Sequence, residues 1–241
     1  MQIIVPDLSG LHNRDLIETN RRLEKSKSYQ NLSTVIISPI VGDLHPTVVQ
    51  SWMGLIRPMN QMVIGPIFMQ GFEVGEAYNN AIKMILENPQ LSSFKYMLTM
   101  EHDNLPPPDG LLKLYESIEE YDVVGGLYWT KGEGGQPMIY GNPKVLPKNF
   151  IPQMPIPGTV MEANGLGQGF NLFKTDIFRK MGSEYYGKWF KTLQEYDPMT
   201  GTKVYTQDLY FYEQGAKFGF KYACDCNVKV GHLDKTTGIV W

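Results

Sequence analysis

The sequence predicts an α/β fold in which a mostly parallel central sheet is flanked by helices. Two kinds of segment lead to this prediction. Unbroken apolar runs rich in β-branched residues, such as TVIISPI at residues 34–40, are typical of buried parallel strands. Between them lie segments with apolar residues at helical spacing, and the two kinds alternate over residues 34–129. We expect one domain over residues 1–241.

The predicted elements follow from these patterns and from turn residues between them. Predicted strands cover residues 34–40, 61–69, 94–100, 122–129, 167–173 and 220–230. Predicted helices cover residues 46–56, 72–87, 107–115, 174–181 and 205–215. Gly and Pro are dense at residues 132–158, which predicts loop and edge structure. We expect a further loop at 182–202 and an exposed tail at 231–241.

Residues 1–33 stand apart from this pattern and are interpreted as an appendage to the domain. Within it, residues 3–5 are a candidate short strand, and residues 14–27 are a candidate polar helix with charges of both signs. The start of the chain has no basic segment followed by a long apolar stretch, so it does not resemble a signal peptide.

Composition excludes several classes of protein. Apolar residues make up 42% and the net charge is −3, which is ordinary for a globular domain and argues against disorder. No run of Lys or Arg marks a nucleic-acid or membrane patch, and no apolar run reaches the roughly 18 residues of a membrane span. Cys224 and Cys226 are too close on a strand for an unstrained disulfide, so we expect free thiols and a cytoplasmic protein.

The most informative segment joins the predicted strand at 94–100 to Glu101-His102-Asp103 and a proline-rich turn. In open α/β sheets, ligands bind beyond the carboxyl ends of the strands. Alternate residues of a strand face the same way, so both carboxylates are expected to converge on one site. A hard divalent cation prefers such oxygen ligands, and Asp103 is the preferred candidate. The structural alternative is that both acids cap the following helix.

Two later segments carry further candidates. Asp208 lies near the start of the predicted helix at 205–215, where an ionised carboxylate is favoured. Such a group in a cleft can accept a proton from a hydroxyl nucleophile, although Asp is also a common helix-capping residue. His232 follows the last predicted strand and a glycine, and histidine is the commonest metal ligand. A surface histidine without any metal is the alternative for this residue.

The order of these motifs resembles that of the GT-A glycosyltransferases, in particular small forms related to the inverting family-2 group. Glu101-His102-Asp103 resembles the Asp-x-Asp signature of that family, with Glu in the first place. The pair formed by Gln207 and Asp208 resembles the Glu-Asp pair, and His232 matches a late histidine of the metal site. The resemblance covers residues 34–232 and implies the GT-A, Rossmann-like nucleotide-diphospho-sugar transferase fold.

The resemblance also implies residue roles. Asp208 would be the catalytic base, and Asp103 and His232 would hold Mn²⁺ or Mg²⁺. Asn79, within a segment that resembles the family's Ala-Arg-Asn helix start, would face the nucleotide, and Gly167 belongs to a Gly-rich strand beside the acceptor. The same glycines could instead form a bulge or a bend. The implied nucleotide-sugar contacts are Pro39, Ile40, Val41, Asn79, Glu101, Lys131, Gly167 and Gln207.

The expected function is therefore transfer of a sugar from a UDP- or GDP-sugar to an acceptor hydroxyl, with inversion at the anomeric carbon. Retention is the alternative stereochemistry on the same fold. The acceptor stays open among a glycan, a lipid-linked glycan, a protein and a modified nucleobase. Residues such as Trp189 and Phe190 are candidates for an aromatic acceptor wall or for a small hydrophobic cluster.

Two other classes of protein compete with this interpretation. A sugar-nucleotide pyrophosphorylase, a nucleotidyltransferase of similar fold, normally has a Gly-rich phosphate loop with a basic residue after the first strand. The segment SPIVGDLH at residues 38–45 lacks one. The second alternative is a non-catalytic carbohydrate-binding module, since aromatic residues make up 12% of the chain.

Overall fold

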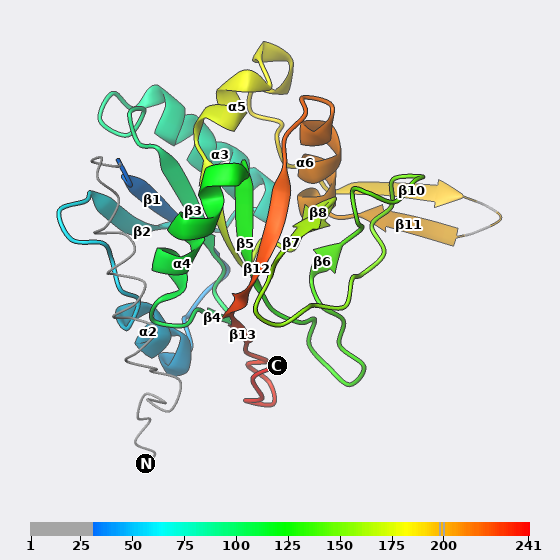
Figure 1. Ribbon diagram of the computed structural model, residues 1–241, viewed down its shortest axis with the longest axis horizontal. Coiled ribbons are helices and arrows are strands. Elements are labelled where there is room, and N and C mark those ends of the chain that lie inside the picture. The colour runs from blue at the N-terminus through cyan, green and yellow to red at the C-terminus, as the bar shows by residue number, and fades with distance from the viewer. Residues whose placement is uncertain (1–30, 198, 200) are drawn as a thin grey trace.

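The computed structural model describes residues 31–197, 199 and 201–241. The predicted strand at 3–5 and the predicted helix at 14–27 lie outside these residues. In the described part, a seven-stranded sheet forms the centre of the molecule, with strand order β2-β1-β3-β9-β5-β12-β7 (Figure 1). Its strands are β1 (Thr34–Ile40), β2 (Val63–Gln70), β3 (Tyr96–Met100), β5 (Val123–Leu127), β7 (Val160–Ala163), β9 (Phe170–Lys174) and β12 (Tyr222–Lys229).

The α/β class is confirmed, but the sheet is mixed. β1 pairs in parallel with β2 and β3, and β5 pairs in parallel with β12. β9 lies between β3 and β5 and is antiparallel to both, and β7 is antiparallel to β12 at the edge. Local periodicity does not encode strand direction, because a buried strand has the same apolar run in either orientation. The sequence therefore did not predict the reversed strands.

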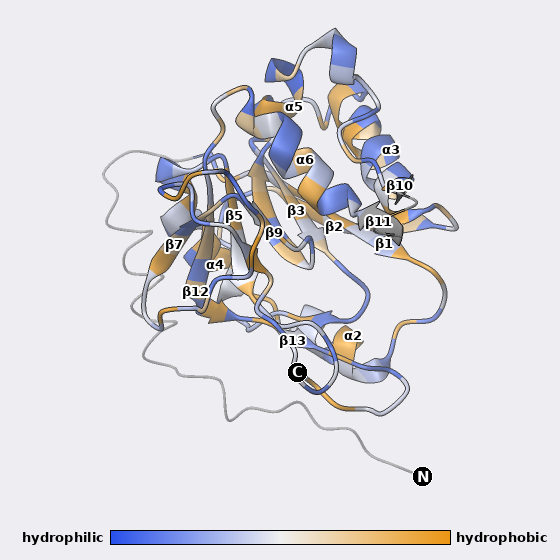
Figure 2. Cartoon of the chain, turned by 90° about the vertical axis from the view of Figure 1, so that its right-hand side faces the viewer, coloured by the Kyte–Doolittle hydropathy of each residue, from blue (hydrophilic) through white to orange (hydrophobic). Residues whose placement is uncertain are grey.

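Helices cover both faces of the sheet (Figure 1). They are α2 (Pro46–Met53), α3 (Val74–Glu87), α4 (Gly110–Ser117), α5 (Asp176–Lys180) and α6 (Gln207–Ala216), with short 3-10 turns at Ile118–Glu120 and Ser183–Tyr185. The side chains of α3, α5 and α6 pack in one apolar cluster, and those of α2 and α4 pack in the other. Successive residues of one strand enter opposite clusters, as Val123 and Val124 of β5 show. Figure 2 shows apolar residues in the central strands and polar residues on the outer faces of the helices.

Most predicted elements are close to those observed. The strand at 34–40 coincides with β1, and the helix at 72–87 contains α3, whose residues Tyr78, Ala81, Ile82 and Ile85 are buried at helical spacing. Cys224 and Cys226 are free thiols, as expected, and both are buried. No helix in the described part of the chain has both the length and the apolar character that a membrane span requires.

The end of the chain differs from the exposed tail that the sequence predicted. β13 (Gly231–His232) pairs antiparallel with β4 (Asn104–Leu105), and Trp241 exchanges two backbone hydrogen bonds of 3.0 Å with His232. Leu233 is only 1% exposed. Residues 232–241 thus form a C-terminal hairpin. In its turn, the Asp234 carboxylate accepts hydrogen bonds from Thr236 N and Thr237 Oγ1, which explains why a short polar segment is ordered. The segment 231–241 therefore packs on the turn that follows β3.

The predicted loop at 182–202 contains a hairpin and part of the core. β10 (Leu193–Asp197) pairs with β11 (Gly201–Tyr205), and this hairpin projects from the body of the protein (Figure 1). Trp189 and Phe190 are 0% and 2% exposed, and Phe190 stacks on Phe211. These two side chains belong to a hydrophobic cluster and do not form an acceptor wall. A third small sheet pairs β6 (Ile139–Tyr140) with β8 (Gly165–Leu166).

Candidate active site

Asp103 and His232 meet at the carboxyl end of the sheet, although they are far apart in the sequence. β3 ends at Met100, and the chain turns through residues 101–104, closed by a 3.0 Å bond from Asn104 N to Glu101 O. Antiparallel pairing of β4 with β13 places Asn104 opposite His232, and Leu233 N donates to Asp103 O at 2.8 Å. The position of His232 is thus set by the same backbone that positions Asp103.

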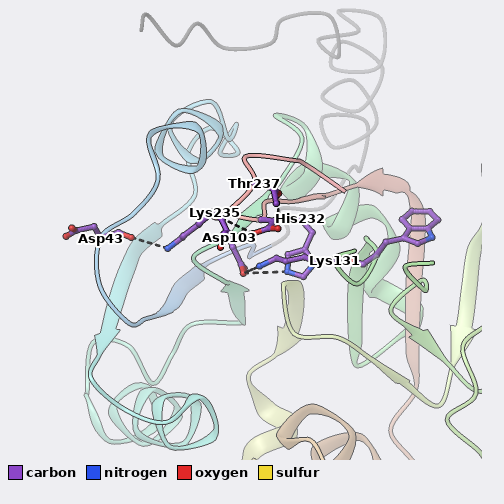
Figure 3. A network of polar contacts seen from close by, with 9 residues as sticks. Asp43, Asp103, Lys131, His232, Lys235 and Thr237 are labelled. Carbon is purple, nitrogen blue, oxygen red and sulfur yellow. Dashed lines mark hydrogen bonds and ion pairs between the residues drawn. The ribbon is translucent and has the colours of Figure 1, made fainter. Parts of the chain in front are cut away.

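The carboxylate of Asp103 faces two basic side chains (Figure 3). Lys131 Nζ forms an ion pair with Asp103 Oδ2, and His232 Nε2 lies 3.6 Å from the same oxygen. Burial alone would raise the pKa of Asp103. The hydrogen bonds and charges of His232 and Lys131 outweigh that effect and hold the pKa well below its usual range. Asp103 is therefore an anion at neutral pH.

The backbone selects the tautomer of His232. Its Nδ1 lies 2.7 Å from the carbonyl oxygen of Trp129, and a carbonyl can only accept a hydrogen bond. Nδ1 therefore carries the hydrogen, and in the neutral ring the lone pair is on Nε2, the nitrogen that faces Asp103. In a histidine that binds metal through one ring nitrogen, the other ring nitrogen usually donates a hydrogen bond to a group such as a backbone carbonyl. The sequence did not predict this role of Trp129, because the residue acts through its backbone carbonyl.

Glu101 has partners different from those of Asp103. Its Oε1 accepts a 2.9 Å hydrogen bond from Tyr78 Oη of α3, and its N donates to Gly169 O. The chain turns directly after Glu101, so the strand alternation that predicted two converging carboxylates does not extend to Asp103. Burial and then the charge of Asp103 raise the pKa of Glu101 to about 7. Near neutral pH this carboxyl group can accept or donate a hydrogen bond, and a ribose hydroxyl can be the partner in either case.

Asp208 is a buried carboxylate in the first turn of α6. It is 7% exposed, and Oδ1 accepts a 2.9 Å bond from Leu209 N. Within the described part of the chain no cation forms an ion pair with it. Burial raises its pKa, and the hydrogen bonds from Thr206 and from the helix backbone only partly oppose that effect. Burial and then the charge of Asp208 raise the pKa of Tyr140 to about 12.

The predicted base-pocket residues lie where β1 ends. Pro39 is buried, Ile40 is half-buried, and Val41 is 79% exposed in the loop that follows. This loop is tied to the C-terminal hairpin, since Lys235 Nζ donates to Asp43 O at 3.1 Å (Figure 3). Lys235 was missed in the sequence, where its only signal is its place three residues after His232.

Asn79 and Gln207 have partners within the protein. Both polar atoms of the Asn79 side-chain amide form hydrogen bonds with the backbone of Phe190. Nδ2 donates to the Phe190 carbonyl at 2.8 Å, and Oδ1 accepts from Phe190 N at 3.0 Å. Asn79 therefore anchors the segment before β10 to α3, and its contact with a nucleotide stays a prediction. Gln207 Oε1 accepts a hydrogen bond from Thr192 Oγ1 at 3.4 Å.

Gly167 is buried, and its lack of a side chain is required by packing. A Cβ at this position would lie 2.3 Å from Tyr128 Oη and 2.5 Å from Met138 Cε. Packing thus explains the glycine at position 167, and the expected approach of a sugar to it stays a prediction. The crowding comes from side chains distant in the sequence, which a local pattern does not reveal.

Replacing Gly167 with Ala should therefore destabilise the protein by about 1–3 kcal/mol through overpacking. Urea unfolding would measure this change. Gly42 has nothing within 4 Å of a Cβ and no positive φ, so Gly42→Ala is the matched control and should change stability little. Wild-type stability of Gly167→Ala would contradict the packing explanation.

Metal-binding capacity rests on Asp103 and His232. Among residues 31–197, 199 and 201–241, no three His, Cys, Asp or Glu side chains gather as a metal site. A protein pair is still sufficient for Mn²⁺ or Mg²⁺ when a diphosphate supplies the remaining oxygens, as is common for nucleotide sites. The anionic Asp103 and the fixed tautomer of His232 fit such a pair.

Comparisons with known proteins identify the fold alone. No family model matches the chain, and no curated protein matches it. Among solved structures, A197 from STIV is similar, with a TM-score of 0.59 and 18% identity over 84% of this chain and 86% of that one. At this identity the similarity concerns architecture and does not extend to activity. The chain is thus an α/β protein whose helices flank a mixed seven-stranded sheet, an architecture consistent with a Rossmann-like fold.

Proposed function

We propose that this protein is a metal-dependent GT-A glycosyltransferase that uses a UDP- or GDP-sugar. One observation carries the proposal: Asp103 and His232 form a pair suited to a metal at the carboxyl end of the sheet, where α/β proteins bind nucleotides. The order of motifs in the sequence supports the same function. When bound there, Mn²⁺ or Mg²⁺ would neutralise the charge that develops on the departing diphosphate.

The residues of the chain have distinct tasks in this proposal. Asp103 and His232 hold the cation, Lys131 contributes a positive charge to the diphosphate, and Glu101 contacts a ribose hydroxyl. Asp208 accepts the proton of the acceptor hydroxyl as its oxygen attacks the anomeric carbon. The new glycosidic bond forms as the bond from the anomeric carbon to the phosphate oxygen breaks, with inversion.

The electrostatics of Asp208 suit a general base. Burial raises its pKa toward the working pH, which strengthens the carboxylate as a proton acceptor. The absence of a paired cation within the described residues has the same effect, because an ion pair would stabilise the anion. A carboxylate that only capped a helix would be expected at the surface, and Asp208 is buried.

A thermal-shift screen tests the proposal directly. UDP and GDP should raise the melting temperature in the presence of Mn²⁺ and much less in excess EDTA. The nucleotide that responds then selects the sugar donors for a hydrolysis assay. A shift with free sugars and none with nucleotides would favour a carbohydrate-binding module. Full hydrolysis in EDTA would reject the metal.

A further inference from the structure

Lys131 already places a positive charge on the predicted metal ligand. Its ammonium forms an ion pair with Asp103 Oδ2, and the two side chains are 33% and 13% exposed. Within the described residues, Asp103 is the sole hydrogen-bonding or ion-pairing partner of this ammonium. His232 Nε2 faces the same carboxylate oxygen at 3.6 Å. The positive charge beside Asp103 and His232 is thus the ammonium of Lys131, a residue of the protein itself.

One short segment after β5 positions both His232 and the Lys131 ammonium. The carbonyl of Trp129 holds Nδ1 of His232, and Lys131 follows two residues later. The backbone that turns the lone pair of His232 toward Asp103 therefore also delivers the ammonium to Asp103. Figure 3 shows Lys131 and His232 reaching Asp103 together. Movement of the Lys131 side chain would leave the histidine in place, since their contacts are made by different groups.

A divalent cation and the ammonium compete for this oxygen. A metal bound to Asp103 Oδ2 would repel the ammonium at close range in a site that is largely shielded from water. The flexible four-carbon stem of a lysine allows it to leave, and a phosphate is a strong alternative partner for its charge. A diphosphate bound to the same metal would bring such oxygens next to the displaced ammonium.

We propose that Lys131 is a resident cation of the metal site, which a divalent metal displaces from Asp103 and which then binds the diphosphate. The proposal rests on the proposed function and adds a mechanism for the order of binding. Metal alone binds weakly because it must break the ion pair between Lys131 and Asp103. Bound nucleotide strengthens metal binding, because its diphosphate is a new partner for the displaced ammonium. By linkage, metal strengthens nucleotide binding by the same factor.

The test is a set of binding titrations with the full chain. Electron paramagnetic resonance measures free Mn²⁺, with and without saturating UDP or GDP, for the wild type and Lys131→Met. Calorimetry measures UDP and GDP binding in saturating Mn²⁺. We expect Lys131→Met to bind Mn²⁺ alone about three- to tenfold more tightly, because the competing charge is gone. The same variant should bind the responding nucleotide about three- to tenfold more weakly in saturating Mn²⁺, because the displaced ammonium that would meet the diphosphate is missing.

Opposite signs for the two ligands separate this mechanism from simple damage to the site. Lys131→Arg keeps the charge and should bind Mn²⁺ as the wild type does. Lys113→Met removes the lysine of another Lys–Asp pair, Lys113–Asp109 at 2.7 Å at the start of α4, and should change neither affinity. Circular dichroism and melting temperature confirm folding of each variant.

The outcomes distinguish this inference from the proposed function. If the wild type binds Mn²⁺ and Lys131→Met binds it equally or more weakly, the competition is overturned while the metal site stands. If no variant binds Mn²⁺ even with UDP or GDP, the metal site itself is rejected, and the inference with it. A gain in Mn²⁺ affinity together with weaker nucleotide binding supports the displacement of Lys131.

Discussion

Replacing Asp208 with Asn should reduce glycosyl transfer by about two to four orders of magnitude while leaving nucleotide binding intact. The amide cannot accept the proton of the acceptor hydroxyl, and general-base catalysis contributes about that factor. Donor and metal contacts involve other residues, so the thermal shift with UDP or GDP and Mn²⁺ should persist. Initial rates with the donor found by the hydrolysis screen measure the loss.

The same substitution should make the folded protein more stable at neutral pH. Burial raises the folded-state pKa of Asp208 above the unfolded value of about 3.9. The group therefore contributes its full stability below pH 4 and loses it as the pH rises through the folded pKa. The melting temperature of Asp208→Asn should exceed that of the wild type at pH 7 and approach it near pH 4.

Asp225 provides a matched control for this prediction. It is also a buried aspartate, 3% exposed, but its oxygens accept hydrogen bonds from Ser117 Oγ at 2.7 Å and from Asn227 N and Nδ2, both at 2.9 Å. Asp225→Asn should lower stability because an amide cannot accept all of these bonds, and transfer should be retained by the folded protein. Unchanged transfer in Asp208→Asn would place the base elsewhere.

Replacing Asp103 with Asn should weaken Mn²⁺ binding by at least about tenfold and reduce transfer strongly. The substitution removes the anionic ligand and leaves only His232 and a neutral amide at the metal position. It also leaves Lys131 without its ion-pair partner, which should cost about 1–3 kcal/mol of folding stability. Mn²⁺ titration and urea unfolding measure the two effects.

Asp109→Asn is the control for Asp103→Asn. Asp109 lies a few residues later in the same segment and is 7% exposed, with Lys113 as its ion-pair partner. This variant should bind Mn²⁺ like the wild type. Retention of full Mn²⁺ affinity by Asp103→Asn would show that the metal does not bind where we propose. Asp103→Asn and Asp208→Asn should thus change stability in opposite directions, although both should abolish most of the activity.

The sequence by itself determined the α/β class and most of its elements. Strand β1 and helix α3 follow from the apolar run at 34–40 and from the helical spacing of Ala77, Ala81 and Ile85. These patterns are local, because a side chain's burial recurs with the period of its own helix or strand. The motif order also selected Asp103 and His232, which the fold brings to within 3.6 Å. Their roles stay predictions.

Only the tertiary structure decided which groups act on one another. The reversed direction of β9, the folded C-terminal hairpin and the crowding at Gly167 all arise between segments distant in sequence. The same is true of the Lys131–Asp103 ion pair and of the burial that raises the pKa of Asp208. Charge interactions and desolvation depend on distance and solvent exposure in space, and a linear pattern of residue types specifies neither.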